Sequence, residues 1–218
     1  MELSVDLHPL LDVVLLHTVW PRPLEDIQSL DNLDVWFSDS AETPLAPIDD
    51  LKTIVRDLLR HGGFKPSGRS KPASEYLIAA VNKGVMSSIN PAVDCCNVAS
   101  LHSGLPISVV DLHRGAGPWR IGLAEPNTAY VFNPTGQVID IGGLVVLFDS
   151  DGPCGGPVKD SQRTKTHPGT TETISVVWGT TKLPGRSRET ADWYTSLMQR
   201  LGATVQEVTP GAPTDRLG

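Results

Sequence analysis

Three polar side chains interrupt an otherwise apolar stretch at helical spacing: Asn90, Asp94 and Asn97. Burying an amide or a carboxylate is costly unless the group is hydrogen-bonded, so these side chains must bind something. They either cap the helix and tie adjacent strands together, or they contact a ligand directly. We favour the structural interpretation for all three, and we extend it to Asp111.

A second polar group lies in a long segment between two expected strands. Loops of this length are often functional. Hydroxyl, guanidinium and amine groups are good partners for phosphate and ribose oxygens, and a glycine-rich lead over residues 152–156 could bind an anion through its amides. A solvated hairpin loop explains the composition equally well. The candidate substrate-binding residues in this segment are Arg163, Thr164, Lys165, Thr166 and Thr170.

The cysteines do not indicate a metal site. Cys95 and Cys96 are neighbours in an expected helix and point about 100° apart, and no pair has the two-residue gap typical of zinc ligands. We therefore expect no metal and three reduced cysteines, buried for structural reasons.

No common catalytic motif is present. The chain contains no Gly-x-Ser-x-Gly elbow, no phosphate-binding Gly-Lys-Ser/Thr loop and no His-Glu-x-x-His helix. The glycines of residues 115–118 lead into an expected strand and are interpreted as a hairpin turn. The sequence thus predicts no cofactor, and it identifies no nucleophile.

The charge distribution is uneven. The net charge is −7, which argues against a protein that grips nucleic acid over its whole surface. Residues 1–51 hold eleven acids and one base, whereas residues 52–83 hold seven bases and two acids. One basic face on an acidic body suits a modest RNA contact, and an ordinary solvated helix face explains it as well. The candidate RNA-binding residues are Lys52, Arg56, Arg60, Arg69 and Lys71.

Helical spacing and end signals predict four helices. The first follows Asp50 and stops at Gly62, and the second opens near Pro72 and ends before Gly84 with Tyr76, Leu77, Ala80 and Val81 facing inward. The third has Asn90 as N-cap, proline at its first position and Gly104 as its stop. The fourth runs from a Ser187 cap to Gly202.

Short β-branched runs separated by glycine or proline predict strands. Because helices come first and strands follow, we expect an α+β fold with a mixed, mostly antiparallel sheet and helices packed on it. Residues 1–209 are expected to form one domain and residues 210–218 a flexible tail. The expected strands are 12–16, 35–37, 107–112, 119–123, 129–132, 138–141, 144–148, 174–178 and 203–208.

The apolar run Val13 to Leu16 is too short to cross a bilayer, and no basic leader precedes it. With its reduced cysteines, the chain is expected to be cytoplasmic and without membrane contact.

The stretch from Ile89 to Leu112 resembles a segment of the tRNA-editing B three/four domain in the phenylalanyl-tRNA synthetase β subunit. That segment reads Ile-Asn-x-x-Val-Asp-x-x-Asn, then Gly-x-Pro and Asp-Leu, and the spacing agrees throughout. Free-standing members of the family are closer still, because they carry an Arg-x-x-Ser-Glu helix start and an Arg-Thr-Lys loop. Arg69, Ser74 and Glu75 are similar to the former in residue type, with four residues between Arg69 and Ser74, and residues 163–165 are similar to the latter.

The resemblance implies the B three/four fold, and it implies tRNA or aminoacyl-tRNA as partner. It covers roughly residues 49–178. One departure concerns function, because Ser108 stands where the synthetase domain commonly has a histidine. Ser108 is therefore a candidate for lining the amino-acid pocket, and the amino-acid specificity does not transfer. The glutamate that the family uses to sense the tyrosine hydroxyl has no match between Glu125 and Gln137.

Three functions follow as hypotheses. The first is a hydrolase that cleaves mischarged aminoacyl-tRNA in trans, for which a positioned water and oxyanion stabilisation suffice. The second is a non-catalytic RNA-binding or regulatory module of the same fold. The third is a domain that binds an amino acid or another small metabolite. An independent synthetase is not expected, because the chain is too short to add an ATP-binding catalytic core.

Overall fold

A computed structural model describes residues 2–38 and 41–211. Ten strands and five α-helices are found in this part of the chain. The strands are β1 (Leu3–Val5), β2 (Leu11–Val19), β3 (Ile107–Asp111), β4 (Trp119–Leu123), β5 (Ala129–Val131), β6 (Val138–Asp140), β7 (Val145–Asp149), β8 (Gly152–Gly155), β9 (Glu172–Thr180) and β10 (Thr204–Glu207). The helices are α1 (Leu33–Trp36), α2 (Leu51–Arg60), α3 (Ala73–Val81), α4 (Pro91–Ser103) and α5 (Arg186–Arg200).

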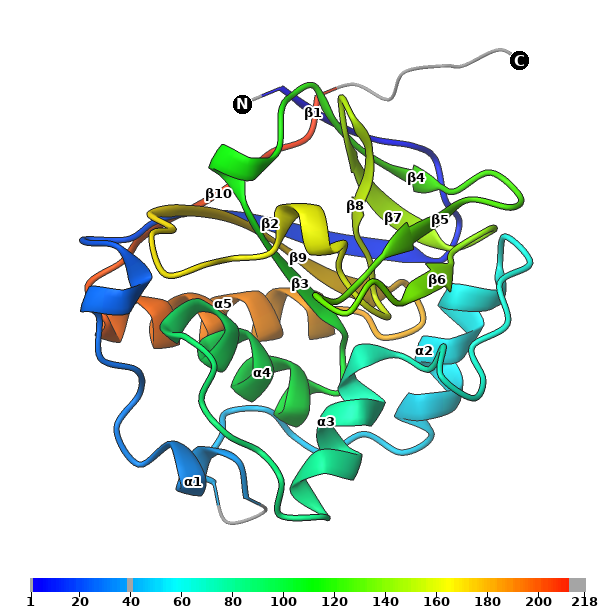
Figure 1. The fold of residues 1–218 in the computed structure, drawn as a ribbon. Helices are drawn as coiled ribbons and strands as arrows, with labels where there is room; N and C mark the ends of the chain where they lie inside the picture. The colour runs from blue at the N-terminus through cyan, green and yellow to red at the C-terminus, as the bar shows by residue number, and fades with distance from the viewer. Residues whose placement is uncertain (1, 39–40, 212–218) are drawn as a thin grey trace.

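The strands form two four-stranded sheets and a separate hairpin (Figure 1). One sheet has the order β10-β2-β9-β3, and its strands are all antiparallel. The other has the order β1-β4-β7-β8, in which only β1 and β4 are parallel. Strands β5 and β6 pair with each other alone. The expected α+β class with mostly antiparallel pairing is confirmed.

The molecule is layered, with α4 and α5 packed on one face of the β10-β2-β9-β3 sheet and the second sheet on its other face (Figure 1). Strand β9 shows how the residues divide between these layers. Ile174, Val176 and Trp178 belong to the apolar core between the two sheets, whereas Val177 belongs to the core under the helices. This division follows from the alternation of side chains along a strand.

Helix α4 has the ends that the sequence predicts. The side chain of Asn90 accepts a hydrogen bond from the Val93 amide at 3.0 Å, and Pro91 occupies the first helical position. Gly104 ends the helix in the left-handed conformation, with φ 71°, and a Cβ there would meet the Leu51 side chain at 2.0 Å. The glycine is therefore needed both for its backbone conformation and for the packing of α2 against α4.

Several element predictions are wrong. The stretch Val35 to Phe37 forms the end of the short helix α1 and not a strand, because three apolar residues cannot distinguish the two. Residues 115–118 are not a hairpin turn, since β3 and β4 belong to different sheets. Ser187 lies inside α5, whose N-cap is Gly185, and its hydroxyl donates to the Asp12 carbonyl instead.

The burial predicted for one face of α3 is also overestimated. Tyr76, Leu77, Ala80 and Val81 are only partly buried, and the fully buried residue of this helix is Ser74. Strands β1 and β8 have no counterpart among the predictions. Each is held by a neighbouring strand, β4 and β7 respectively, and has little apolar pattern of its own.

The predicted tail begins at residue 210, and residues 212–218 of it lie outside the described residues. Gly211 still pairs with β1, because its amide donates to the Leu3 carbonyl at 2.8 Å. Over the described residues, no helix is long and apolar enough to cross a membrane. The single-domain boundary and the cytoplasmic location stay predictions.

Candidate functional site

The polar residues of α4 connect three segments of the chain. Asp94 is buried, and its carboxylate accepts from the hydroxyls of Ser29 at 2.7 Å and Ser88 at 2.5 Å and from the Ile89 amide at 2.9 Å. Asn90 donates from its Nδ2 to the Thr166 hydroxyl at 3.1 Å. Asn97 is half-buried, and within the described part of the chain its side chain has no hydrogen bond. Two of the three predicted polar residues are thus occupied by protein partners.

Asp111 is enclosed in the same way. Its carboxylate is buried and accepts from the Thr170 hydroxyl at 2.6 Å and from the His113 amide at 2.8 Å. The Nε2 atom of His167 lies 3.1 Å from the same carboxylate. Thr170 also accepts from the His167 amide, so its hydroxyl both donates and accepts within the protein. These contacts close the turn between the long loop and β9.

Ser108 lies in the core between the two sheets. It has the same parity along β3 as Val110, which faces that core, and it has no exposed surface. Its hydroxyl donates to the Gly156 carbonyl at 3.1 Å and accepts from the indole of Trp178 at 2.9 Å. In this structure, the position where the related synthetase segment carries a histidine is filled by the serine and a tryptophan.

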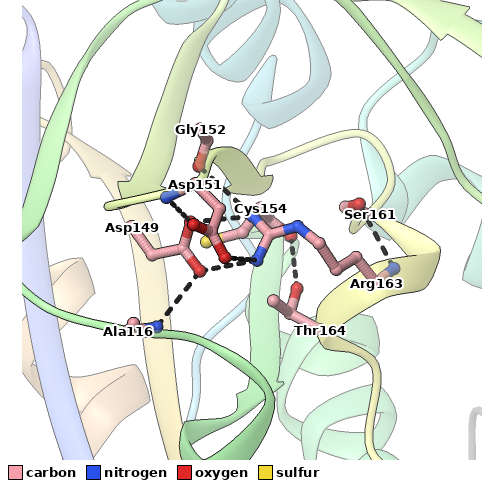
Figure 2. Close-up of polar contacts among 8 residues, drawn as sticks. All are labelled: Ala116, Asp149, Asp151, Gly152, Cys154, Ser161, Arg163 and Thr164. Atoms are coloured by element: carbon pink, nitrogen blue, oxygen red, sulfur yellow. Dashed lines mark hydrogen bonds and ion pairs between the residues drawn. The ribbon is translucent and has the colours of Figure 1, made fainter.

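Arg163 forms an ion pair inside the loop (Figure 2). Its guanidinium donates two hydrogen bonds of 2.7 Å to Asp149, whose side chain is fully buried. The same carboxylate accepts from the amides of Ala116 and Asp151, and the next residue, Thr164, donates to the Cys154 carbonyl (Figure 2). The hydrogen bonds to Asp149 raise the pKa of Arg163. Both side chains therefore serve the packing of the loop against β8.

The charges predicted on α2 are largely neutralised. Arg56 donates to both oxygens of Glu75 at 2.6 and 2.7 Å, and Arg60 pairs with Asp57 at 3.0 Å. Lys52 is mostly exposed and lies 3.8 Å from Glu75. These three cations lie four residues apart along α2, and the acid that neutralises Arg56 comes from α3. Of the predicted basic residues, Arg69 is exposed and Lys71 is half-buried in the turn before α3.

Arg69 lies at a pocket of about 340 Å³ beside the β5–β6 hairpin. We call it the Arg69–Lys159 pocket. The pocket opens between the turn that precedes α3 and the outer side of the hairpin. Its lining combines two cations, an aromatic ring, a carboxylate and several smaller groups: Arg69, Ser70, Phe132, Gln137, Val138, Ile139, Asp140 and Lys159.

Lys159 is the central cation of this pocket. Its Nζ lies 3.9 Å from the centroid of the Phe132 ring and 5.5 Å from that of Tyr76. The main-chain carbonyl of Lys159 accepts from the Tyr130 hydroxyl, which holds the backbone in place. Burial lowers the pKa of Lys159, and the positive charges of Arg69 and Lys165 lower it further. Among the described residues, neither Arg69 nor Lys159 has an acidic side chain within ion-pair distance.

Lys165 does not line the pocket but holds the backbone of Phe132, which does. Its Nζ donates to the Phe132 carbonyl at 2.6 Å, and burial lowers its pKa although Asp160 acts in the opposite direction. Asp160 is only partly exposed and accepts from the Gly156 amide at 3.0 Å and the Val109 amide at 3.4 Å. Burial raises the pKa of Asp160 to about 6.

Sequence reasoning found Arg69 and Lys165 but missed Lys159, Phe132 and Asp140. These three come from the hairpin and from the residue just before the predicted loop, and none belongs to a motif. The sequence indicates these residues only as a group, because an aromatic residue and several charged residues lie in short segments rich in turns. The fold brings these residues to Arg69, from which they lie 63 to 90 positions away along the chain. The roles predicted for individual residues stay predictions.

The fold and the pocket define a class: an α+β domain with a small pocket at a hairpin, lined by two cations and one carboxylate. A family model described as the B3/4 domain matches residues 66–190, which is more than half of the chain. The chain belongs to the B3/4 domain family. The predicted relationship is therefore confirmed.

A solved structure has a similar fold. It is an N-terminal fragment of the phenylalanyl-tRNA synthetase β-subunit from Pyrococcus horikoshii, with a TM-score of 0.51 and 11% identity. The match covers 97% of this chain and 52% of that fragment, so the chain spans about half the length of this structural relative. No curated protein matches the sequence.

Proposed function

We propose that this chain binds the acceptor end of a tRNA or aminoacyl-tRNA, with the Arg69–Lys159 pocket holding its backbone. The observation that carries the proposal is the arrangement of Arg69 and Lys159, two cations at one pocket without an acidic partner. Their mutual repulsion contributes to the lowered pKa of Lys159. An anion at the pocket removes this repulsion, and a phosphate is the anion that both side chains suit.

The surroundings of the pocket suit a polynucleotide better than a free anion. Phe132 and Tyr76 place aromatic rings beside Lys159. Single-stranded nucleic acids are bound by this combination, in which cations follow the backbone and rings stack on bases. Membership of the B3/4 domain family adds support, since the similar structure is part of a tRNA synthetase β-subunit.

The geometry favours binding over hydrolysis. Three of the six candidate substrate-binding residues are engaged within the protein: Ser108 between the sheets, Arg163 with Asp149, and Thr170 with Asp111. Among the described residues that line the pocket, Ser70 and Asp140 carry groups that could act as nucleophile or base, and neither forms an ion pair or a hydrogen bond with a group that would activate it. Editing in trans therefore requires a water activated by the substrate or by a rearranged loop. The third hypothesis, binding of a free amino acid, fits the pocket less well, because a free amino acid lacks the phosphate that the two cations suit.

Binding is tested with purified tRNA by filter retention at increasing salt. We expect the wild-type affinity to fall with salt, as it does when phosphates are neutralised by protein cations. The double variant R69A/K159A is expected to bind at least tenfold more weakly and to have a salt slope smaller by about 2, roughly 1 for each lost phosphate contact. R188A is the matched control, because Arg188 is exposed, is paired with Glu207 and does not line the pocket.

Equal affinity of wild type and R69A/K159A would overturn the proposed site, and no tRNA binding by wild type would overturn the proposed function. The same proteins are incubated with tRNAs carrying mismatched amino acids. Release of amino acid above the buffer rate would establish the editing hypothesis in place of simple binding. The absence of release with intact tRNA binding supports the non-catalytic module.

A further inference from the structure

We infer that the Arg69–Lys159 pocket holds one unstacked base of the bound RNA on the Phe132 ring, and that Asp140 selects bases with an exocyclic amino group. This inference rests on the proposed function and assigns a base specificity to the same site. It predicts a preference for adenine, cytosine or guanine over uracil at one position.

The Phe132 ring has a face that Lys159 covers in the free protein and that a base can occupy once the lysine moves. Lys159 lies over its face at 3.9 Å in the free protein, and such cation–π contacts are weak at accessible positions. The backbone beneath is fixed, because the Phe132 amide donates to the Gln137 carbonyl at 3.0 Å and its own carbonyl accepts from Lys165. A base can therefore replace the ammonium on a ring whose backbone is held in place.

The displaced lysine gains a better partner. Its side chain is long and its Nζ has no ion pair among the described residues. When a base takes the ring face, the ammonium is released toward the phosphate of the same nucleotide, beside Arg69. Stacking and charge neutralisation then occur in one step, and the cost of desolvating Lys159 is offset by a direct charge-assisted hydrogen bond.

Asp140 provides the selectivity. It lies at the end of β6 on the exposed side of the hairpin and lines the pocket. One carboxylate oxygen accepts from the Gly142 amide at 2.8 Å, which orients the group, and the other has no partner within the described residues. A carboxylate accepts from the amino groups of adenine, cytosine and guanine. Uracil presents carbonyl oxygens on both sides of its single imide N–H, and these repel a carboxylate.

The size of the pocket limits its occupant. A volume of about 340 Å³ lies at the lower end of the range for small-ligand sites, roughly 300 to 1,000 Å³. The aromatic ring, the carboxylate and the cations thus suit one nucleotide. Neighbouring nucleotides remain on the surface, where Tyr76 and the turn around Arg69 are partly exposed.

The test uses fluorescently labelled RNA octamers of cytosine, adenine or uracil, with affinities measured by anisotropy. Cytosine against uracil is the sharpest comparison, because the two pyrimidines have the same shape and differ in the amino group and the adjacent ring nitrogen. We expect wild type to bind the cytosine and adenine octamers at least fivefold more tightly than the uracil octamer. This ratio corresponds to the discrimination typical of one base contact.

Two variants test the Phe132 ring and the Asp140 carboxylate separately. D140N keeps the shape of the side chain but adds a donor, so we expect the cytosine-to-uracil ratio to fall below twofold. F132L keeps an apolar side chain under Lys159 but removes the aromatic face, and it is expected to weaken all three octamers by about fivefold or more. R188A is again the control and is expected to leave the affinities and their ratio unchanged. Circular dichroism establishes that each variant is folded.

Equal affinities of wild type for the cytosine and uracil octamers, or an unchanged ratio in D140N, would overturn the base pocket. The proposed function would survive that result if R69A/K159A still weakened tRNA binding. If wild type bound neither the octamers nor tRNA, the inference and the proposed function would both be wrong.

Discussion

Arg163 illustrates, at the scale of single residues, how a group suited to binding is used for folding. Its guanidinium neutralises the buried Asp149 through two hydrogen bonds. Removing one partner of a buried ion pair leaves an uncompensated charge and costs about 3–5 kcal/mol. Arg163 is itself about one-third exposed, so we predict a smaller loss for R163A, about 2–3 kcal/mol after allowing for solvent screening.

Urea unfolding followed by circular dichroism measures this loss. K52A is the control, since Lys52 is mostly exposed, and its effect should stay within about 0.5 kcal/mol. A stable R163A protein with weakened tRNA binding would contradict our account and would give Arg163 the binding role that the sequence suggested.

Asp160 should make stability depend on pH. Its folded pKa, about 6, is above the value near 3.9 of an unfolded aspartate. A raised carboxyl pKa contributes stability that is fully present below the unfolded value and is lost as the pH rises through the folded value. We predict that this contribution, at most about 3 kcal/mol, disappears between pH 4 and 6.5.

The measurement compares urea midpoints of wild type and D160N across this interval. The variant cannot ionise at this position, so the difference between the two proteins should change steadily in its favour as the pH rises. A pH-independent difference would show that the ionisation of Asp160 is not coupled to folding.

At the scale of elements, α4 was predicted well because its signals are local. Asn90, Pro91 and Gly104 fix both ends of the helix within its own sequence. Strand β1 and helix α1 were missed because their structure depends on distant partners, β4 for the former and the Trp193 ring beside Trp36 for the latter. Local patterns therefore predict elements that carry their own end signals.

The same distinction explains the candidate site. The sequence identified cations by type, but Arg56 and Arg163 are neutralised by acids 19 and 14 residues away along the chain. Which cations remain free is decided by tertiary packing. Lys159 is a candidate because the hairpin places Phe132 beside it, which the sequence alone does not indicate.

The N-cap of α4 also ties the long loop to the helix. We predict that N90A lowers the free energy of unfolding by about 1–2 kcal/mol, because it removes the cap to Val93 and the hydrogen bond to Thr166. T166V removes only the second contact and should cost less, about 0.5–1.5 kcal/mol. Thermal or urea unfolding of both variants provides the test. Equal losses would mean that the cap itself contributes little.

At the scale of the whole molecule, the net charge of −7 limits where an RNA can bind. An acidic body repels the backbone except where cations lack acidic partners, and the Arg69–Lys159 pocket is such a place. We therefore predict a localised contact with a modest salt slope, about −2 to −4. Titration of tRNA binding between low and physiological salt measures it. A slope near −8 or steeper would indicate an extended basic interface and would contradict a localised contact.

The central claim concerns the ammonium of Lys159, and its pKa tests that claim directly. Two-dimensional NMR of lysine side chains, assigned with K159R, follows the titration of Lys159 with and without saturating acceptor-stem RNA. We predict a pKa below the ordinary value in the free protein and a higher pKa in the complex, because a nearby phosphate stabilises the charged form. An unchanged Lys159 resonance and pKa at saturating RNA would contradict the account.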